Sequence, residues 1–221
     1  MQNSKNDALT AERDRTRPRG RPRAFDREAA LSQAMRVFWL KGFEATSISD
    51  LKDAMGIGSP SLYAAFGSKE ALFAEAVRYY VDTFGRQAWM QFRSAETVRE
   101  AVEAYLLTSA AALTGSLCDV PRGCMVTLSS VGDEGHVELG ELVRAERAAL
   151  FQSVKGRLAD AVSKGEISAS TDIHALARYV QTVQSGMSIL ARDGASREEL
   201  EAVARASMLG WDAYIGTDQK T

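Results

Sequence analysis

Short amphipathic segments divided by glycines restrict what residues 26–75 can fold into. The segment DREAALSQAMRVFWLKGF starts at Asp26, a favourable N-cap, and repeats apolar residues three and four apart until Gly42. A second segment, ISDLKDAM, begins after Thr46 or Ser47 and has the same spacing. This spacing is that of one face of an α-helix, so it predicts two short helices with a glycine-terminated turn between them.

A third segment follows the Gly-Ile-Gly break at residues 56–58. It is expected to start with Ser59 as the N-cap and Pro60 at the first helical position, and to end at Gly67. Two short helices joined by a tight turn that contains glycine are typical of a helix-turn-helix. The residues spaced to form the small core between them are Leu51, Met55, Ile57 and Leu62. The outward face of the third helix, which would lie in a major groove, carries Ser59, Ser61, Tyr63 and Ala64.

A basic segment, RTRPRGRPRAFD, precedes these helices at residues 15–26. Its prolines and its glycine exclude a helix and favour an extended chain. An extended chain with arginine at every second position is narrow enough to enter a minor groove about 6 Å wide. The core PRGRP resembles an AT-hook. The arginines assigned to a minor-groove contact are Arg17, Arg19, Arg21 and Arg23. A solvated basic tail is the alternative.

The charge is distributed unevenly along the chain. Residues 1–72 carry 12 Lys and Arg against 9 Asp and Glu, a net charge of +3, and the remainder carries 15 against 20, a net charge of −5. A basic head on an acidic body indicates that one end of the protein meets a polyanion.

Composition excludes several other classes. No apolar run approaches the roughly 20 residues that a membrane span needs, and the polar N-terminus is not a secretory signal, so we expect a cytoplasmic protein. Two cysteines are too few for a disulfide framework, and the two histidines stand far apart in the 221-residue chain. No metal and no cofactor is therefore expected.

Residues 46–73, TSISDLKDAMGIGSPSLYAAFGSKEALF, resemble the DNA-binding signature of the TetR family of bacterial transcriptional regulators. The preceding KGFEAT fits as well, and the likeness covers roughly residues 27–75. The residues that fall in register are Gly56, Leu62, Tyr63, Phe66, Lys69, Glu70 and Leu72. The resemblance implies a three-helix DNA-binding domain, an all-helical ligand-binding and dimerisation domain, and repression that a small molecule relieves.

The resemblance also implies which side chains touch DNA. By position in the motif these are Ser47, Ser59, Pro60, Ser61, Tyr63 and Lys69, with Ala64 beside Tyr63 on the same face. Lys69 stands at a helix start, where a cation opposes the helix dipole unless a DNA phosphate docks there. A solvated surface lysine is the alternative.

Two departures from the family pattern affect this prediction. Lys52 replaces a small residue, and Ala64 and Ala65 follow Tyr63 where larger side chains are common. The third helix therefore lacks Arg, Asn and Gln, the usual readers of base edges. We expect site choice to depend more than usual on the arginine segment and on DNA shape.

Residues 74–215 are predicted to be helical throughout, so the expected fold class is all-α. The predicted organisation is a basic arm at 1–25, a helix-turn-helix domain at 26–70, and an effector-binding and dimerisation domain at 71–221. Large side chains that could line a pocket inside the helical bundle are Trp89, Phe92, Tyr105, Met125, Phe151, Gln184 and Met187. Each of them could instead be ordinary core.

The last two helices alternate large apolar residues with small ones, among them Gly186, Ala191, Ala206 and Gly210. The resemblance implies that they pair with their copies in a homodimer, and packing within one chain is the alternative. A dimer would place two reading helices about 34 Å apart, so that they meet successive major-groove turns of a palindrome.

Other functions fit the sequence less well than a ligand-responsive repressor does. Phosphate-binding loops, nucleophile elbows and HExxH motifs are missing from the sequence, so an enzyme is not expected. An architectural binder of AT-rich DNA would use the arm alone, but it would not need about 140 residues of acidic helical bundle. Cys118 and Cys124 flank Arg122, which could lower a thiol pKa, so a redox-sensing or electrophile-sensing regulator is a further alternative to inert cysteines.

Overall fold

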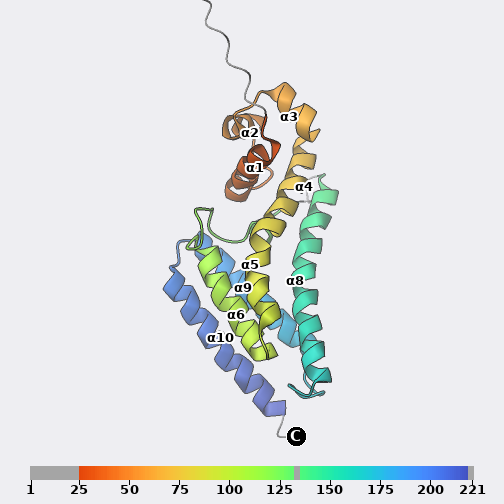
Figure 1. Ribbon diagram of the computed structural model, residues 1–221, viewed down its shortest axis with the longest axis vertical. Coiled ribbons are helices and arrows are strands. Elements are labelled where there is room, and N and C mark those ends of the chain that lie inside the picture. The colour runs from red at the N-terminus through yellow and green to blue at the C-terminus, as the bar shows by residue number, and fades with distance from the viewer. Residues whose placement is uncertain (1–24, 132–134, 219–221) are drawn as a thin grey trace, which may run out of the picture.

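The computed structural model describes residues 25–131 and 135–218, and every regular element in these ranges is helical. The N-terminal part consists of α1 (Arg27–Lys41), α2 (Ile48–Met55) and α3 (Ser59–Phe66), which gather at one end of the elongated molecule (Figure 1). The next helix, α4 (Lys69–Tyr80), leads from this end into the rest of the protein. The arrangement confirms the predicted all-α fold.

The helix starts follow the capping chemistry of the sequence. Asp26 accepts a hydrogen bond from the backbone N–H of Ala29, and Ser68 caps α4 in the same way. The predicted start of α3 is wrong by one residue. Gly58, not Ser59, is the N-cap, because its backbone is extended and its carbonyl accepts the first helical bond, from Leu62 at 3.0 Å.

The core of the N-terminal part extends beyond the three short helices. Leu51 and Leu62 are fully buried between α2 and α3, as the spacing predicts, and Met55 is buried beside them. Phe38 of α1 packs edge-on against Phe73 of α4, with ring centroids 5.2 Å apart. This core therefore includes α4 well past residue 70, and the predicted domain boundary there stays a prediction.

The larger C-terminal part is a helical bundle with its own core. A π-helical turn, η1, connects α4 directly to α5, and short loops join the helices that follow. These elements are η1 (Val81–Gly85), α5 (Arg86–Ser94), α6 (Val98–Leu113), α7 (Met125–Leu128), α8 (Val137–Ser163), α9 (Ile173–Arg192) and α10 (Arg197–Asp218). No helix in the described ranges is long and apolar enough to span a bilayer.

Candidate nucleic-acid interface and internal cavity

The outward face of α3 presents most of the residues expected to read DNA. Pro60, Ser61, Tyr63 and Ala64 are exposed, whereas Ser59 is half-buried. Tyr63 leaves 47% of its surface exposed although it is a large aromatic residue. The opposite face of the helix is buried, so α3 is held by its apolar side and leaves its small polar side open.

Ser47 lies at the exposed start of α2, inside a capping box. Its hydroxyl donates to the Asp50 carboxylate at 2.8 Å and accepts from the backbone N–H of Asp50 at 3.1 Å. Lys41 of α1 donates to the same carboxylate at 2.6 Å. The bond from Lys41, together with those from the backbone and hydroxyl of Ser47, lowers the pKa of Asp50 to about 2.

We expect the charge on Asp50 to stabilise the N-terminal part of the protein, α1 to α3, in a pH-dependent way. Because its folded pKa lies below the unfolded value of 3.8, its contribution is present above that value and is lost as the pH falls towards about 2. Asp50→Asn should lower the melting temperature at neutral pH, and the difference from wild type should shrink below about pH 4. Asp53→Asn, on the exposed side of α2, is the control. A pH-independent deficit in Asp50→Asn would contradict this account.

Lys69, at the first position of α4, does not extend freely into solvent. Its ammonium lies over the Phe43 ring, 4.3 Å from the ring centroid, and the residue is half-buried. Ser68 caps the same helix end and leaves free backbone N–H groups in its first turn. The aromatic contact therefore holds a positive charge beside a helix N-terminus, on the same end of the molecule as α3.

The four arm residues Arg17, Arg19, Arg21 and Arg23 lie outside the described residues. Their minor-groove role stays a prediction.

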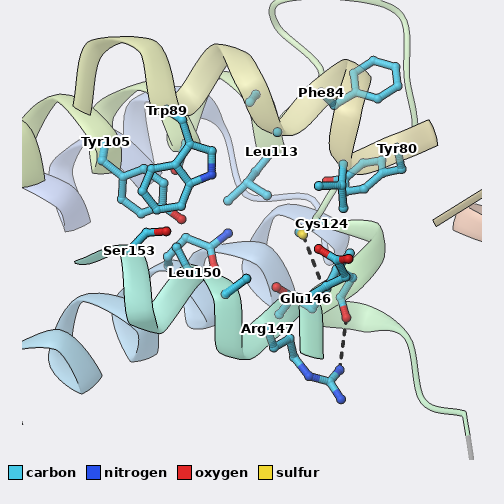
Figure 2. A pocket seen from close by; sticks show the side chains of 18 residues that line it. Tyr80, Phe84, Trp89, Tyr105, Leu113, Cys124, Glu146, Arg147, Leu150 and Ser153 are labelled. Carbon is cyan, nitrogen blue, oxygen red and sulfur yellow. Dashed lines mark hydrogen bonds between the residues drawn. The ribbon is translucent and has the colours of Figure 1, made fainter. Parts of the chain in front are cut away.

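A partly open cavity of about 200 Å³ lies in the C-terminal part, where α4 gives way to η1. Its walls come from α4, η1, α5 and α6 on one side and from α7, α8 and α9 on the other (Figure 2). The aromatic and polar residues among those that line it are Tyr80, Phe84, Trp89, Tyr105, Ser109, Cys124, Thr127, Glu146, Arg147, Ser153 and Gln184.

The structure brings three of the seven predicted effector residues to this cavity, namely Trp89, Tyr105 and Gln184. The other four do not line it. They are Phe92, Met125, Phe151 and Met187, which are buried in the two cores. They are apolar throughout, so the packing of neighbouring helices accounts for their burial.

The sequence interpretation missed Tyr80, Phe84, Cys124 and Glu146 as parts of one cavity wall. A signal for Glu146 does exist, because it falls at helical spacing in the apolar stripe of Leu139, Val143 and Leu150. A carboxylate in such a stripe is unusual and indicates an inward-facing polar site.

Burial changes the protonation chemistry of two phenols in the cavity wall. Burial raises the pKa of Tyr80, and the neighbouring Cys124 raises it further. Burial likewise raises the pKa of Tyr105. Both phenols therefore stay neutral at physiological pH and can act only as hydrogen-bonding groups.

The segment before α7 connects the cavity wall to the N-terminal part. The indole N–H of Trp39, in α1, donates to the Gly123 carbonyl at 3.0 Å. Arg192, at the end of α9, donates to the carbonyls of Arg122 and Trp39 at 2.8 and 2.9 Å. Cys124, the residue that follows Gly123, lines the cavity. A displacement of this part of the cavity wall would therefore pull on the hydrogen bonds that hold Trp39, and so displace the end of α1.

The two cysteines differ in their surroundings. Cys118 is exposed, whereas Cys124 is half-buried and its thiol accepts a bond from the backbone N–H of Thr127 at 3.5 Å. Within the described ranges, no cluster of three or more His, Cys, Asp or Glu residues has the arrangement of a metal site.

Comparison with known proteins places this geometry in context. The family model described as bacterial regulatory proteins, tetR family, matches residues 30–76. The HTH-type transcriptional repressor ComR of Escherichia coli K12 is 36% identical over 89% of this chain and 94% of its own length. The HTH-type transcriptional repressor BdcR of the same strain is 33% identical over 84% and 88%.

A solved structure of similar shape contains DNA. It is a cysteine-substituted variant of the TetR family transcriptional regulator CifR, complexed with a 26-base-pair double-strand operator. The two chains superpose with a TM-score of 0.80 at 39% sequence identity, covering 86% of this chain and 98% of that one. The likeness therefore includes the cavity-bearing helices as well as the N-terminal head.

Proposed function

Since the chain belongs to the TetR family of bacterial transcriptional regulators, we propose that it represses transcription as a homodimer on a palindromic operator and leaves the DNA when a small molecule fills the cavity. The observation that carries this proposal is one unbroken helical path. Helix α4 starts at Lys69, beside the reading face, and ends at Tyr80, in the cavity wall. A ligand that moves the end of α4 would move the reading head.

The junction after α4 supports this coupling. Val81–Gly85 forms a π-helical turn, and Val81, Phe84 and Gly85 all line the cavity. Single π-helical turns inside α-helices occur frequently at functional sites, because the extra residue disrupts the regular hydrogen-bond ladder. Ligand contacts at this turn would act on the helix that carries the head.

Exposed apolar residues on the last two helices support the homodimer. The large ones on α9 and α10 are Ile189, Leu190, Val203, Leu209 and Tyr214, with exposed fractions from 38% to 72%. Side chains of this kind gathered on neighbouring helices are typical of a protein–protein contact. The small residue Gly186 on α9, where a Cβ would meet no atom within 4 Å, would let a second copy approach closely. Gly210 instead makes room for Tyr179 of the same chain, whose hydroxyl lies 3.0 Å from where a Cβ would stand.

The proposal is tested by binding of the full-length protein to promoter fragments flanking its own gene, measured by fluorescence anisotropy at moderate ionic strength. We expect clear preference over random duplex, and a footprint limited to one short palindrome. Tyr63→Ala should weaken binding at least tenfold without unfolding the protein, because it removes the large exposed side chain of α3. Broad coverage of AT-rich DNA would favour an architectural binder, and no preference for any fragment would overturn the proposal.

The arginine arm is expected to contribute measurably to this binding. Replacing Arg17, Arg19, Arg21 and Arg23 together by glutamine should lower operator affinity by about tenfold or more and flatten its dependence on salt concentration, because fewer counterions are released. The Tyr63→Ala variant is a useful comparison, since loss of an α3 side chain should leave the salt dependence nearly unchanged. Unaltered affinity and unaltered site choice in the arginine variant would show that the arm is a solvated tail.

The alternative to response by reversible ligand binding is response through a thiol, that of Cys118 or Cys124. The position of Cys124 in the cavity wall, next to the link with α1, favours it over Cys118 as the responsive group. No catalytic step is assigned, because the family consists of transcriptional regulators. A repressor that acts on chromosomal DNA would work in the cytoplasm, which is the location we propose.

A further inference from the structure

The cavity wall carries a carboxylate that has no counter-ion. Glu146 of α8 is half-buried, and among the side chains that the structure describes it makes no salt bridge and no hydrogen bond. An anion that is partly withdrawn from water without a partner loses hydration energy and gains nothing in return. The unliganded protein therefore holds a negative charge that is available to a bound molecule.

The neighbouring arginine does not neutralise Glu146. Arg147 donates to the carbonyl oxygens of Val126 and Ser129, both at 3.1 Å, and its guanidinium points away from the cavity (Figure 2). Arg147 is also the only Lys or Arg among the described residues that line the cavity. Because the Arg147 guanidinium points away, the Glu146 carboxylate gives the interior of the cavity a negative character.

Aromatic rings occupy both ends of the same cavity (Figure 2). Trp89 stacks on Tyr105 with ring centroids 5.1 Å apart, and Tyr80 stacks on Phe84 at 5.6 Å. The faces of aromatic rings carry partial negative charge and attract cations, most strongly where water is excluded. The rings thus add to the negative character that Glu146 establishes.

A buried amide provides an independent sign of a missing ligand. Gln184 of α9 lines the cavity with only 5% of its surface exposed, and its side-chain oxygen is buried without a hydrogen-bond donor. An unsatisfied buried acceptor costs about 1–3 kcal/mol. A ligand with an N–H group in the cavity would remove that cost.

We propose that the effector of this regulator is an organic cation, a protonated amine or quaternary ammonium joined to a flat apolar body. The charged nitrogen pairs with Glu146, the apolar body lies between the aromatic rings, and any N–H it bears donates to Gln184. The inference rests on the proposed function and specifies the chemical class of its effector.

Other ligand classes fit the cavity less well. A carboxylate or phosphate would face the Glu146 carboxylate, and among the described lining residues the only guanidinium, that of Arg147, points away. A neutral apolar molecule would cover Glu146 and leave a desolvated, unpaired charge, which is strongly unfavourable. A cation pairs with Glu146, and a cation that also carries an N–H satisfies the Gln184 oxygen as well.

The test is isothermal titration calorimetry of the full-length protein with two pairs of probes matched in shape. Benzyltrimethylammonium is compared with its uncharged carbon analogue neopentylbenzene, and phenyltrimethylammonium with its uncharged carbon analogue tert-butylbenzene. We expect at least one of the two cations to bind, and to bind at least tenfold more tightly than its partner. Equal binding within both pairs, or no binding of either cation, would overturn the inference.

Substitution of Glu146 tests whether its carboxylate is the group that binds the cation. Glu146→Gln should lower the affinity for the cation at least tenfold, whereas Glu141→Gln, an exposed position on the same helix, should not change it. Unchanged affinity in Glu146→Gln would contradict the assignment. If that variant proves unstable in a thermal melt, the comparison of shape-matched probes on the wild-type protein still decides the question.

Failure of this inference is distinguishable from failure of the proposed function. Promoter preference is measured without any probe, so a protein that selects its promoter but binds no cation has a different effector class. A protein that binds the cations and shows no promoter preference would instead contradict the proposed repressor.

Discussion

Replacing Gly123 with alanine is expected to destabilise the protein by about 3 kcal/mol, a loss that few single substitutions reach. Gly123 has a φ of +80°, which L-residues with a side chain rarely adopt. A Cβ at this position would lie 2.5 Å from a methyl carbon of Leu128 and 2.9 Å from the backbone carbonyl oxygen of Ser188. The carbonyl belongs to α9 and cannot move without disturbing that helix, so overpacking adds to the backbone strain.

The matched control is Gly165→Ala. Gly165 has a similar φ of +74°, but a Cβ there meets no atom within 4 Å. Its substitution should therefore cost only the backbone strain, about 1 kcal/mol. Thermal melts at one fixed protein concentration should show a decrease in melting temperature of about 10 °C for Gly123→Ala and about 3 °C for Gly165→Ala. Equal decreases would show that the close approach to α9 has no energetic effect.

The position of Gly123 gives this substitution a functional consequence as well. Its carbonyl accepts the indole N–H of Trp39, and the next residue lines the cavity. A shift of this segment should therefore weaken the coupling between the cavity and α1. A variant that stays folded at low temperature is expected to bind its operator with a reduced response to the effector.

Leu209→Glu is expected to convert the proposed homodimer into a monomer and to lower operator affinity by at least a hundredfold. Leu209 lies on α10 and leaves 72% of its surface exposed, the largest fraction of any large apolar residue in the described ranges. In a two-fold symmetric interface the substitution enters twice, so two carboxylates would lose water without gaining a partner. Loss of the second reading head then removes the gain from bivalent binding.

Sedimentation analysis and fluorescence anisotropy measure these two effects separately. Met90→Glu is the control, because Met90 is a large apolar residue of α5 with 63% of its surface exposed but lies outside the last two helices. We expect Met90→Glu to remain a dimer with unchanged operator affinity. A dimeric Leu209→Glu protein would place the subunit contact on another face.

The helices and their caps could be predicted from the sequence because both depend on residues close together in the chain. Asp26 accepts from the N–H three residues later, as a good N-cap does, and Ser196 and Glu199, spaced three apart, form a capping box. The predicted start of α3 is one residue too late because Gly58 and Ser59 are both acceptable caps. The choice between them depends on the backbone of the preceding turn.

The same local periodicity identified the outward face of α3, since burial of Leu62 leaves Tyr63 and its neighbours exposed whatever the rest of the chain does. The cavity is different. Tyr80, Cys124, Glu146 and Gln184 lie on four separate elements, and each faces the same space only because those helices pack at particular rotations. Helical spacing shows which residues share a face, but the packing of distant segments selects the faces that enclose a void. The outward face of α3 could therefore be predicted from the sequence, whereas the cavity residues could be identified only from the packing of the whole bundle.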